Sequence, residues 1–290
     1  MNSGFWQLSM DEQSKAKTAF LKKDGLFQFL KMPFGLSNSP GTFQRVMNLV
    51  LRGLTWKSCL VYIDDNIIYS KNFGEHLIHL AQVFEALTKA NLRLSAKKTI
   101  LASHEVDYLG SRVGRDGLKP RARLVTAVKD FPQPADASGV KRFVHMAGFY
   151  RRFIPGFAEI AGPLQALLKN DATFNWGVEE NAAFQKLKDA LISKPCLALP
   201  DFVLPFTLAT DAAQTTGMGA ALMQDFGHGL RPIAYWSRAL TDAQKRYGVS
   251  ESECLAIVEA VKVFRPYLYG RKFTLETDHQ ALTWLMKGLR

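Results

Sequence analysis

The chain has 290 residues, of which 47% are hydrophobic and 22% charged, and its net charge is +11. This composition excludes a disordered chain, the length predicts about two domains, and the basic excess favours a polyanionic partner such as nucleic acid. No apolar run approaches the roughly 18 residues of a membrane span, the N-terminus lacks a secretory signal, and the three distant cysteines form no disulfide framework, so an intracellular location, cytoplasmic or nuclear, is expected.

In the first 118 residues, alternating hydrophobicity predicts strands, helical spacing predicts two helices, and turn residues between β-rich runs predict hairpins. In chain order, the predicted elements are strands Phe5–Met10 and Leu26–Met32, a helix to Leu54 that follows Ser39-Pro40-Gly41, a hairpin of Cys59–Ile63 and Ile67–Ser70, a helix that ends near Asn91, and a hairpin of Val106–Leu109 and Ser111–Val113. A turn is predicted next, at Asp116-Gly117.

The rest of the chain predicts a helical segment followed by an α/β unit. Helical patterns occupy 121–130, 138–153, 157–168 and 179–192, and prolines then predict a domain boundary near 195–205. Beyond the boundary we expect strands Phe206–Thr210, Gly219–Gln224 and Ile233–Ser237, a helix Ser250–Leu268, a strand Phe273–Thr277 and a helix His279–Met286. This succession of strands and helices is typical of an α/β domain.

More than half of the excess positive charge lies within residues 119–156, whose net charge is +6, whereas residues 157–290 are neutral. The basic side chains of this segment are Lys119, Arg121, Arg123, Lys129, Lys141, Arg142, Arg151 and Arg152. A charge run can be a solvated helical face. Interleaved aromatic residues favour a surface that both packs and holds a phosphate backbone.

Two acids lie side by side at the tip of the first apolar hairpin, in Tyr62-Ile63-Asp64-Asp65-Asn66. Aspartate and asparagine favour turns, which is one interpretation. The other is a metal site, because paired carboxylates are hard oxygen ligands that bridge Mg²⁺ to substrate phosphates in phosphoryl transfer.

A second set of acids comprises Asp211, Glu253 and Asp278. Asp211 and Asp278 each follow a predicted strand, and Glu253 lies in the first turn of the long helix. Ser250 and Glu253 also have the spacing of a capping box, so Glu253 can be a helix cap. The alternative is that two strand ends and a helix start converge on a metal pair.

Short motifs lie in order along the chain: Ser3-Gly4-Phe5-Trp6-Gln7, Lys17-Thr18-Ala19-Phe20, Met32-Pro33-Phe34-Gly35-Leu36, Tyr62-Ile63-Asp64-Asp65, Tyr108-Leu109-Gly110, Gly148-Phe149-Tyr150-Arg151-Arg152-Phe153-Ile154, Thr210-Asp211-Ala212, Tyr267-Leu268-Tyr269-Gly270 and Thr277-Asp278-His279. In this order and spacing the chain resembles the pol region of gypsy-type LTR retrotransposons. The resemblance implies the α+β palm and helical thumb of a reverse transcriptase, followed by an α/β ribonuclease H-like domain with a mixed sheet. It places the palm at 1–118 with the fingers missing, the thumb and connection at 119–200, and the ribonuclease H-like domain, without its C-terminus, at 201–290.

The resemblance also implies roles. Asp64 and Asp65 match polymerase acids that hold metal, and Asp211, Glu253 and Asp278 match ribonuclease H ligands. The implied cofactor is Mg²⁺, for which Mn²⁺ can substitute. Nucleotide- or primer-binding positions are Phe5, Pro33, Phe34, Gly35, Tyr62, Lys98, Leu109 and Gly110, among which Phe5 would block a ribose 2′-OH and Lys98 would protonate pyrophosphate. Without the motifs, Phe5 would be interpreted as a buried strand residue, Pro33-Phe34-Gly35 as a turn and Lys98 as a solvated lysine. Leu109 and Gly110 would belong to an ordinary hairpin.

The implied partners are an RNA and DNA primer–template, an RNA–DNA hybrid, deoxynucleoside triphosphates and other parts of a pol polyprotein, with no membrane. Lys119, Arg121, Arg123, Lys141, Arg142, Arg151 and Arg152 would follow the nucleic-acid backbone.

The chain departs from the family at both ends. The family has a third polymerase aspartate at the position that would immediately precede Met1, and a fourth ribonuclease H acid beyond Arg290. Two functions therefore stay open: an RNA-directed DNA polymerase with ribonuclease H, and a polymerase-inactive nucleic-acid-binding remnant. An unrelated basic binding module is a third hypothesis.

Overall fold

The computed structural model describes residues 1, 3–169, 172–193, 195–213, 216–279 and 282. The chain forms two compact units, Met1–Tyr108 and Leu109–Arg290. Among the described residues, no helix combines the length and apolarity that a bilayer crossing requires.

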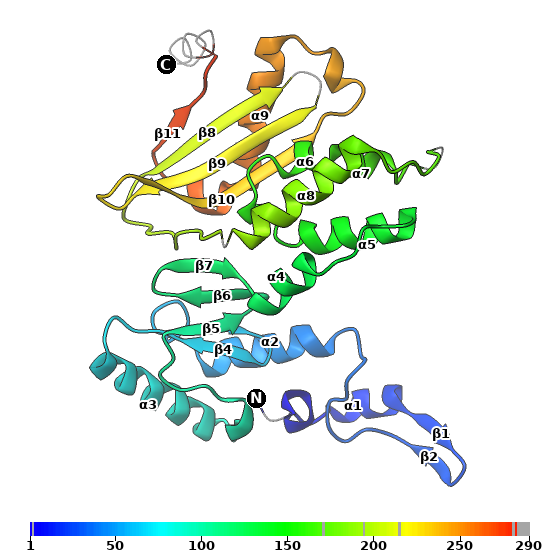
Figure 1. Ribbon diagram of the computed structural model, residues 1–290. Coiled ribbons are helices and arrows are strands. Elements are labelled where there is room, and N and C mark those ends of the chain that lie inside the picture. Colours follow the sequence, from blue (N-terminus) through cyan, green and yellow to red (C-terminus); the bar gives the residue numbers. More distant parts are fainter. Residues whose placement is uncertain (2, 170–171, 194, 214–215, 280–281, 283–290) are drawn as a thin grey trace. The chain divides into compact units, whose positions relative to one another are not determined.

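The first unit packs two helices on a hairpin. Helices α2 (Ser39–Val50) and α3 (Phe73–Lys89) enclose a core with the hairpin strands β3 (Cys59–Tyr62) and β4 (Asp65–Ile68) (Figure 1). The core side chains are Phe43, Met47 and Leu51 of α2, Cys59 of β3, and Val83 and Leu87 of α3. The other elements of this unit are η1 (Gly4–Gln7), α1 (Glu12–Lys15), η2 (Ala16–Thr18), β1 (Phe20–Lys22), β2 (Gly25–Phe27), η3 (Ala96–Lys98) and β5 (Glu105–Tyr108).

The second unit begins with a hairpin and a group of helices. Strands β6 (Ser111–Gly114) and β7 (Gly117–Pro120) pair antiparallel. The helices that follow are α4 (Ala122–Lys129), α5 (Ala137–Gly148), η4 (Arg151–Phe153), α6 (Phe157–Ile160), α7 (Gly162–Ala166) and α8 (Val178–Ile192). They bury a core that includes Val128, Val140, Phe143, Leu164 and Leu187.

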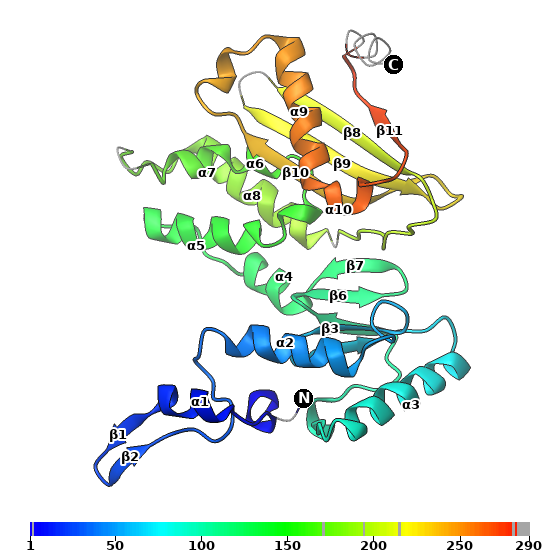
Figure 2. The same ribbon diagram turned by 180° about the vertical axis from the view of Figure 1, so that it is seen from behind.

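A mixed sheet completes the second unit. Strands β8 (Phe206–Ala213), β9 (Gly217–Asp225), β10 (Leu230–Ala239) and β11 (Phe273–Glu276) lie in the order β10-β9-β8-β11, antiparallel except that β11 runs parallel to β8. Helix α9 (Val249–Val263) crosses one face of the sheet against β8 and β9, as Figure 2 shows, and η5 (Gln244–Arg246) and α10 (Arg265–Leu268) flank it in the chain. The mixed sheet that the sequence predicted is therefore present.

Several local predictions were wrong at the N-terminus. Phe5–Met10 is not a strand but the 3₁₀ helix η1 followed by one isolated bridge, Ser9 to Lys31. Gly4 lies so close to the Phe43 ring that a Cβ on Gly4 would be 2.8 Å from the ring. Residues three apart lie above one another in a 3₁₀ helix, and Phe5 and Leu8 accordingly both pack on the core. The predicted strand Leu26–Met32 is regular only over β2, which pairs with the unpredicted β1.

Several helix boundaries also differ from prediction, and the helix predicted to reach Leu54 ends at Val50. The helix predicted at 157–168 is broken into α6 and α7, because Pro163 starts a new helix and cannot continue the old one. The helix predicted at 138–153 ends at Gly148, and the helix predicted over Ser250–Leu268 ends at Val263 with α10 after it. The helix predicted over His279–Met286 lies outside the described residues, apart from His279 and Leu282.

A segment after α8 joins the hairpin to the sheet. Leu118 of β7 and Leu197 exchange two backbone hydrogen bonds of 2.7 and 2.9 Å, and the Ala198 amide donates to the Pro232 carbonyl of β10 at 2.8 Å. Gly117, with φ of +130°, lets the strands approach, since a Cβ there would lie 2.1 Å from the Leu197 carbonyl oxygen.

Gly117→Ala is therefore expected to lower the free energy of unfolding by at least about 2 kcal/mol, because it adds both a clash and an unfavourable backbone angle. Urea denaturation measures the change. Gly229→Ala is the matched control, since Gly229 also has a positive φ, of +98°, but nothing within 4 Å of its Cβ position. Equal losses for both variants would contradict the clash.

Candidate active site

Three carboxylates from distant parts of the sequence meet at one end of the sheet, where β8 and β11 end. In the parallel pair, Glu276 of β11 lies opposite Ala209 of β8, so the same register carried two residues further places Asp278 beside Asp211. Glu253 reaches them from α9, which packs on β8. Ligand oxygens of Asp211, Glu253 and Asp278 all lie within 4.8 Å of one another.

Glu253 is the buried member of this acidic cluster, with 3% of its surface exposed, whereas Asp211 and Asp278 are exposed. Its Oε1 accepts a hydrogen bond from the Ala212 amide at 3.2 Å, and its Oε2 is buried with no hydrogen-bond partner. Burial raises the pKa of Glu253, and the charges of Asp278 and Asp211 raise it further, against opposing effects of the Ala212 amide and His279. A buried, unpartnered carboxylate oxygen is costly unless a cation satisfies it.

Of the two interpretations of Glu253, the helix cap was wrong. Helix α9 begins after Gly248, whose amide donates to Glu251 Oε2 at 2.9 Å, so Glu251 is the carboxylate that caps the helix. Ser250, the other half of the predicted box, instead contacts His279 through Oγ and Nε2 at 2.8 Å. Glu253 is left free to face the two aspartates.

The acidic cluster fits a divalent cation. It supplies only hard oxygen donors, and the buried Glu253 Oε2 still lacks a partner. Without a cation, three close carboxylates repel one another.

Glu253→Gln is expected to raise the melting temperature of the metal-free protein at pH 7 by about 2–4 °C, about 1 kcal/mol for a domain of this size. The amide keeps the shape, removes the buried charge and can donate to its acidic neighbours. Because the pKa of Glu253 is higher in the folded than in the unfolded protein, the stability gained by protonating Glu253 is fully present below its unfolded pKa. This stability is lost as the pH rises through the folded pKa. The rise in melting temperature caused by Glu253→Gln should therefore shrink toward about pH 4, where Glu253 itself is protonated. Differential scanning fluorimetry against pH checks this, and a pH-independent gain would contradict it.

The second predicted acid pair lies in the first unit. Asp64 is in the two-residue turn between β3 and β4, and Asp65 is the first residue of β4, opposite Tyr62. Both aspartates are exposed. Within the described part of the chain, they belong to no cluster of three acidic, histidine or cysteine ligands. The Met1 ammonium donates to the Asp64 carbonyl oxygen at 3.2 Å.

Gln44 of α2 holds this turn, a role that was not predicted. Its Oε1 accepts from the Ile63 amide at 2.6 Å and its Nε2 contacts the Val61 carbonyl at 3.3 Å. Ile63 has a φ of +52°, which is unfavourable for a β-branched residue and therefore needs such support. A glutamine next to the buried Phe43 was the only local signal.

Among the predicted nucleotide positions of the first unit, Phe5 and Phe34 pack on each other. The ring centroid of Phe5 lies 5.0 Å from that of Phe34 and 5.4 Å from that of Phe43. The Pro33 carbonyl accepts from Ser39 Oγ at 3.1 Å, and Gly35 turns the chain with a φ of +91°. Phe34 is largely exposed. Tyr62 and Lys98 are exposed as well, on β3 and η3.

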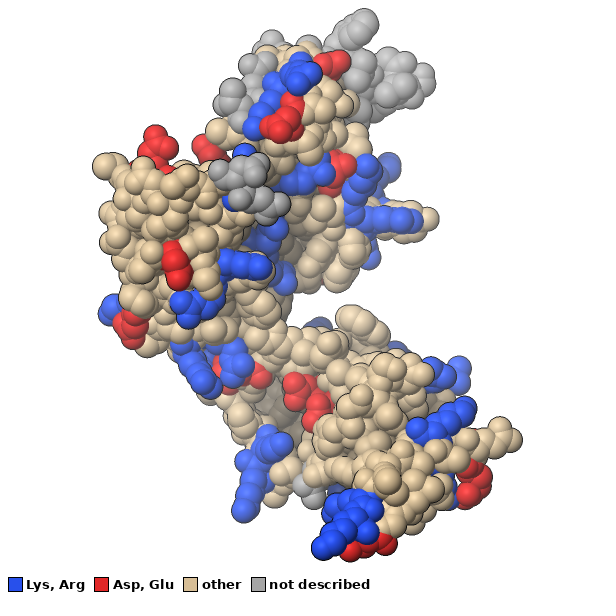
Figure 3. Space-filling model, turned by 90° about the vertical axis from the view of Figure 1, so that its right-hand side faces the viewer, with Lys and Arg blue, Asp and Glu red and all other residues tan. Residues whose placement is uncertain are grey.

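The predicted backbone-binding residues of the second unit differ in their surroundings. Arg123, Lys141 and Arg142 project from α4 and α5 and are exposed, and Lys119 pairs with Asp116 at 3.1 Å. Arg151 donates to the Ser237 carbonyl of β10 and lies over the Phe157 ring, and Arg152 lies over Phe153. On the face drawn in Figure 3, lysine and arginine cover more of the surface than the acidic residues do.

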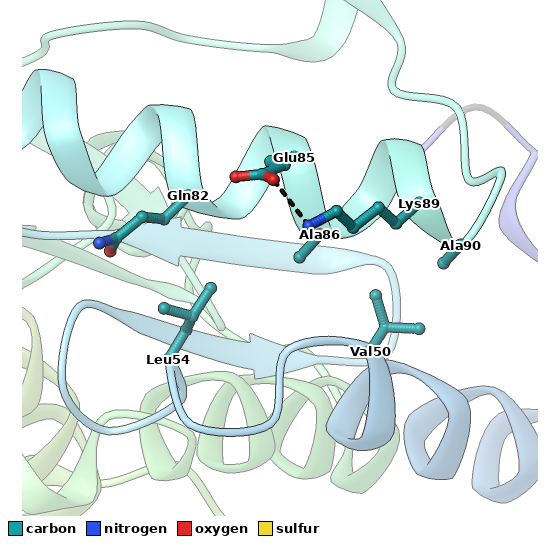
Figure 4. Close-up of a pocket in the computed structure, with 7 residues that line it drawn as sticks. All are labelled: Val50, Leu54, Gln82, Glu85, Ala86, Lys89 and Ala90. Carbon is teal, nitrogen blue, oxygen red and sulfur yellow. Dashed lines mark ion pairs between the residues drawn. The ribbon is translucent and has the colours of Figure 1, made fainter.

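An open groove of about 540 Å³ lies on the first unit between the end of α2 and α3 (Figure 4). Its lining residues are Val50, Leu54, Gln82, Glu85, Ala86, Lys89 and Ala90. Glu85 and Lys89 pair at 2.7 Å, and hydrogen bonding to Lys89 lowers the pKa of Glu85. None of the predicted site residues lines it.

Comparison with known proteins assigns both parts of the chain. Residues 1–113 match the family described as "Reverse transcriptase (RNA-dependent DNA polymerase)", and residues 176–275 match "RNase H-like domain found in reverse transcriptase". Over 97% of its length the chain is 45% identical to the Retrovirus-related Pol polyprotein from transposon 297 of Drosophila melanogaster, and over 98% it is 37% identical to that from transposon gypsy. The chain belongs to the gypsy-type Pol polyproteins. The resemblance inferred from the motifs is confirmed.

The chain covers 26% and 28% of these two Pol polyproteins, about a quarter of their length. Its fold is that of the foamy viral protease–reverse transcriptase: the structure solved with double-stranded DNA has a TM-score of 0.85 at 24% identity, covering 98% of this chain and 59% of the other. The structure solved with an RNA/DNA hybrid has a TM-score of 0.83 at 23% identity, covering 99% and 39%. The predicted fold class, a palm and thumb followed by a ribonuclease H-like domain, is confirmed.

Reverse transcriptases and ribonucleases H are enzyme families, so this Pol segment is of an enzyme family. The reverse transcriptase match ends at residue 113 and the ribonuclease H match begins at 176, while the two compact units meet between Tyr108 and Leu109. The domain limits at 118 and 200 and the individual site roles stay predictions.

Proposed function

We propose that this Pol segment carries the chemistry of both families: RNA-directed DNA polymerisation on a primer–template, and cleavage of the RNA strand of an RNA–DNA hybrid. The observation that carries the proposal is the acidic cluster of Asp211, Glu253 and Asp278 with its unpartnered buried oxygen. The solved foamy viral relatives bound to double-stranded DNA and to an RNA/DNA hybrid support nucleic acid as the substrate class.

In the ribonuclease H part, Asp211, Glu253 and Asp278 would hold Mg²⁺ or Mn²⁺. When bound, such ions activate a water and stabilise the leaving oxygen in a two-metal phosphoryl transfer. The chain's own contribution is to orient the ligands. The Ala212 amide fixes Glu253 Oε1, and Ser250 contacts His279, the residue that follows Asp278.

In the polymerase part, Asp64 and Asp65 would hold Mg²⁺ on a turn that Gln44 fixes. Phe5 would exclude a ribose 2′-OH, so that deoxynucleoside triphosphates are preferred, and the Pro33-Phe34-Gly35 turn and Tyr62 would flank the incoming nucleotide. Lys98 would protonate the pyrophosphate leaving group, and Leu109 and Gly110 would hold the primer end.

Nucleic acid would be held chiefly through its phosphates. Exposed Arg123, Lys141 and Arg142, together with Lys119 and Arg121, lie in the segment of highest positive charge. Arg151 and Arg152 would also bind phosphates, in addition to their contacts within the protein. Binding of this kind weakens steeply with salt. We expect other parts of a Pol polyprotein as further partners, inside the cell.

A cleavage assay tests the ribonuclease H proposal. The chain is incubated with Mg²⁺ or Mn²⁺ and an RNA–DNA hybrid, and with double-stranded RNA and double-stranded DNA as controls. Cleavage confined to the RNA strand of the hybrid is the expected result. No cleavage with either ion, in protein that a thermal-shift titration shows to bind Mn²⁺, would overturn it.

A second function is a nucleic-acid-binding remnant that is inactive in polymerisation. The two-acid turn at Asp64 favours it, because no third ligand joins these aspartates among the described residues. Primer extension with Mg²⁺ separates the two. Incorporation that is lost in Asp64→Asn would overturn the remnant hypothesis.

A further inference from the structure

The turn that follows β5 rests directly on the helical part of the second unit. Leu109 and Gly110 both have positive φ, +45° and +83°, as a two-residue hairpin turn requires. A Cβ on Gly110 would lie 2.6 Å from Cζ of Phe149. The Phe149 ring therefore covers the glycine and leaves room for no other residue.

Tyr150, the next residue, reaches the same turn from within the core. It is 1% exposed, and its ring meets those of Phe149 and Phe153 edge-on at centroid distances of 5.1 and 5.8 Å. Its hydroxyl donates to the Gly110 carbonyl oxygen at 2.6 Å and accepts from the Arg121 amide at 3.3 Å.

These two bonds join Tyr150 to two segments that are far from it in the sequence. Gly110 is 40 residues from Tyr150, and Arg121, the residue before α4, is 29 residues away. Both partners are backbone groups, so the link fixes the course of the chain rather than one side chain. The packed ring is rigid, and its hydroxyl therefore sets where the Gly110 carbonyl points and how the half-exposed Leu109 is presented.

We propose that Tyr150 is a positioning residue for the primer-binding turn, through which the helices of the thumb hold Leu109 and Gly110 in a productive orientation. This inference rests on the proposed function, which assigns Leu109 and Gly110 to the primer end. Tyr150 does not touch the primer; it acts through the Gly110 carbonyl.

The test compares Tyr150→Phe with the unaltered chain and with Tyr247→Phe, which removes a hydroxyl from an exposed tyrosine. Fluorescence anisotropy gives the affinity for a DNA duplex with a recessed 3′ end and for a blunt duplex of equal length. Hydrogen exchange gives the protection of the amides in 109–112. In Tyr150→Phe we expect the preference for the recessed end to fall about fivefold, the size of one lost hydrogen bond. We also expect exchange at 109–112 to rise. Both should be unchanged in Tyr247→Phe.

The outcomes separate the inference from the function it rests on. If the unaltered chain binds both duplexes equally, the primer-binding assignment fails, and with it the role of Tyr150. If the unaltered chain prefers the recessed end and Tyr150→Phe keeps both that preference and the exchange protection, only the positioning role fails. A lower melting temperature with equally reduced binding of both duplexes would show a merely structural role and would also overturn it.

A second pair of variants tests the same proposal if Tyr150→Phe does not fold. Arg121 has a φ of −64°, which suits proline, so Arg121→Pro removes the amide donor to Tyr150 without straining the backbone. Arg121→Ala is its control, because it removes the same side chain and keeps the amide. The proline variant should lose about twofold more of the recessed-end preference than the alanine variant, and equal losses would contradict the proposal.

Discussion

Replacing Asp278 by asparagine is expected to reduce cleavage of the RNA strand of an RNA–DNA hybrid at least about a hundredfold, with the same result for Asp211→Asn. Each variant leaves two carboxylates where three converge within 4.8 Å, and cations held there would lose several kcal/mol of charge stabilisation. A gel-based cleavage assay in Mg²⁺ and in Mn²⁺ measures the rates.

The control for both variants is Asp242→Asn. Asp242 is exposed and pairs with Lys245 at 3.0 Å, away from the acidic cluster in the sequence and outside its ligand set. An exposed ion pair contributes little to stability, so this variant should cleave at the rate of the unaltered chain. We expect Mn²⁺ to raise the melting temperature of the unaltered chain, and the aspartate variants should lose this rise. Full cleavage by Asp278→Asn would refute the cluster as the catalytic site.

Adding an aspartate in front of Met1 is expected to increase primer extension at least about a hundredfold. The family resemblance places the third polymerase carboxylate at that position, and the Met1 ammonium already lies 3.2 Å from the Asp64 carbonyl oxygen. A residue joined to Met1 therefore starts beside the turn that carries Asp64 and Asp65. A third carboxylate would complete the ligand set for two cations.

The matched control for this prediction carries asparagine instead of aspartate in an otherwise identical extension. Incorporation of a radiolabelled deoxynucleotide on a primed template gives the rates. The asparagine chain should stay at the level of the unextended one, and Asp64→Asn should abolish the gain of the aspartate chain. Equal rates with aspartate and asparagine would show that the added carboxylate does not act as a ligand.

The sequence predicted what is encoded locally. The hairpin around Asp64 was correct because two β-rich runs flank residues that favour turns. The strands before Asp211 and Asp278 were predicted correctly from their β-rich runs, although β8 continues to Ala213. The order of the motifs identified the family. Phe5–Met10 was predicted wrongly because Phe5 packs on Phe43 from the 3₁₀ helix η1, and only the residues around Ser9 pair with another segment, at Lys31.

What the sequence missed depends on contacts between distant segments. Glu253 could be a cap or a ligand until the start of α9 was known, and one residue, Gly248, decides it. Their neighbours in the sequence do not reveal what Gln44 and Tyr150 bind, although Tyr150 lies in one of the family motifs, since their partners lie 19 and 40 residues away. Such residues hold the turns on which the predicted site residues lie, and only the folded chain reveals them.

The short segment at Leu197 and Ala198 determines where this Pol segment can be divided. It is bonded to β7 on one side and to β10 on the other, and Ala158 and Arg151 add bonds from the helices to Ser237. A ribonuclease H fragment expressed from residue 176 or 201 would lack the hairpin of β6 and β7 and the helices α4 to α7. The apolar surface that these elements cover would be exposed. The helices and the sheet should therefore unfold in one cooperative step, and soluble expression should require a start near Leu109.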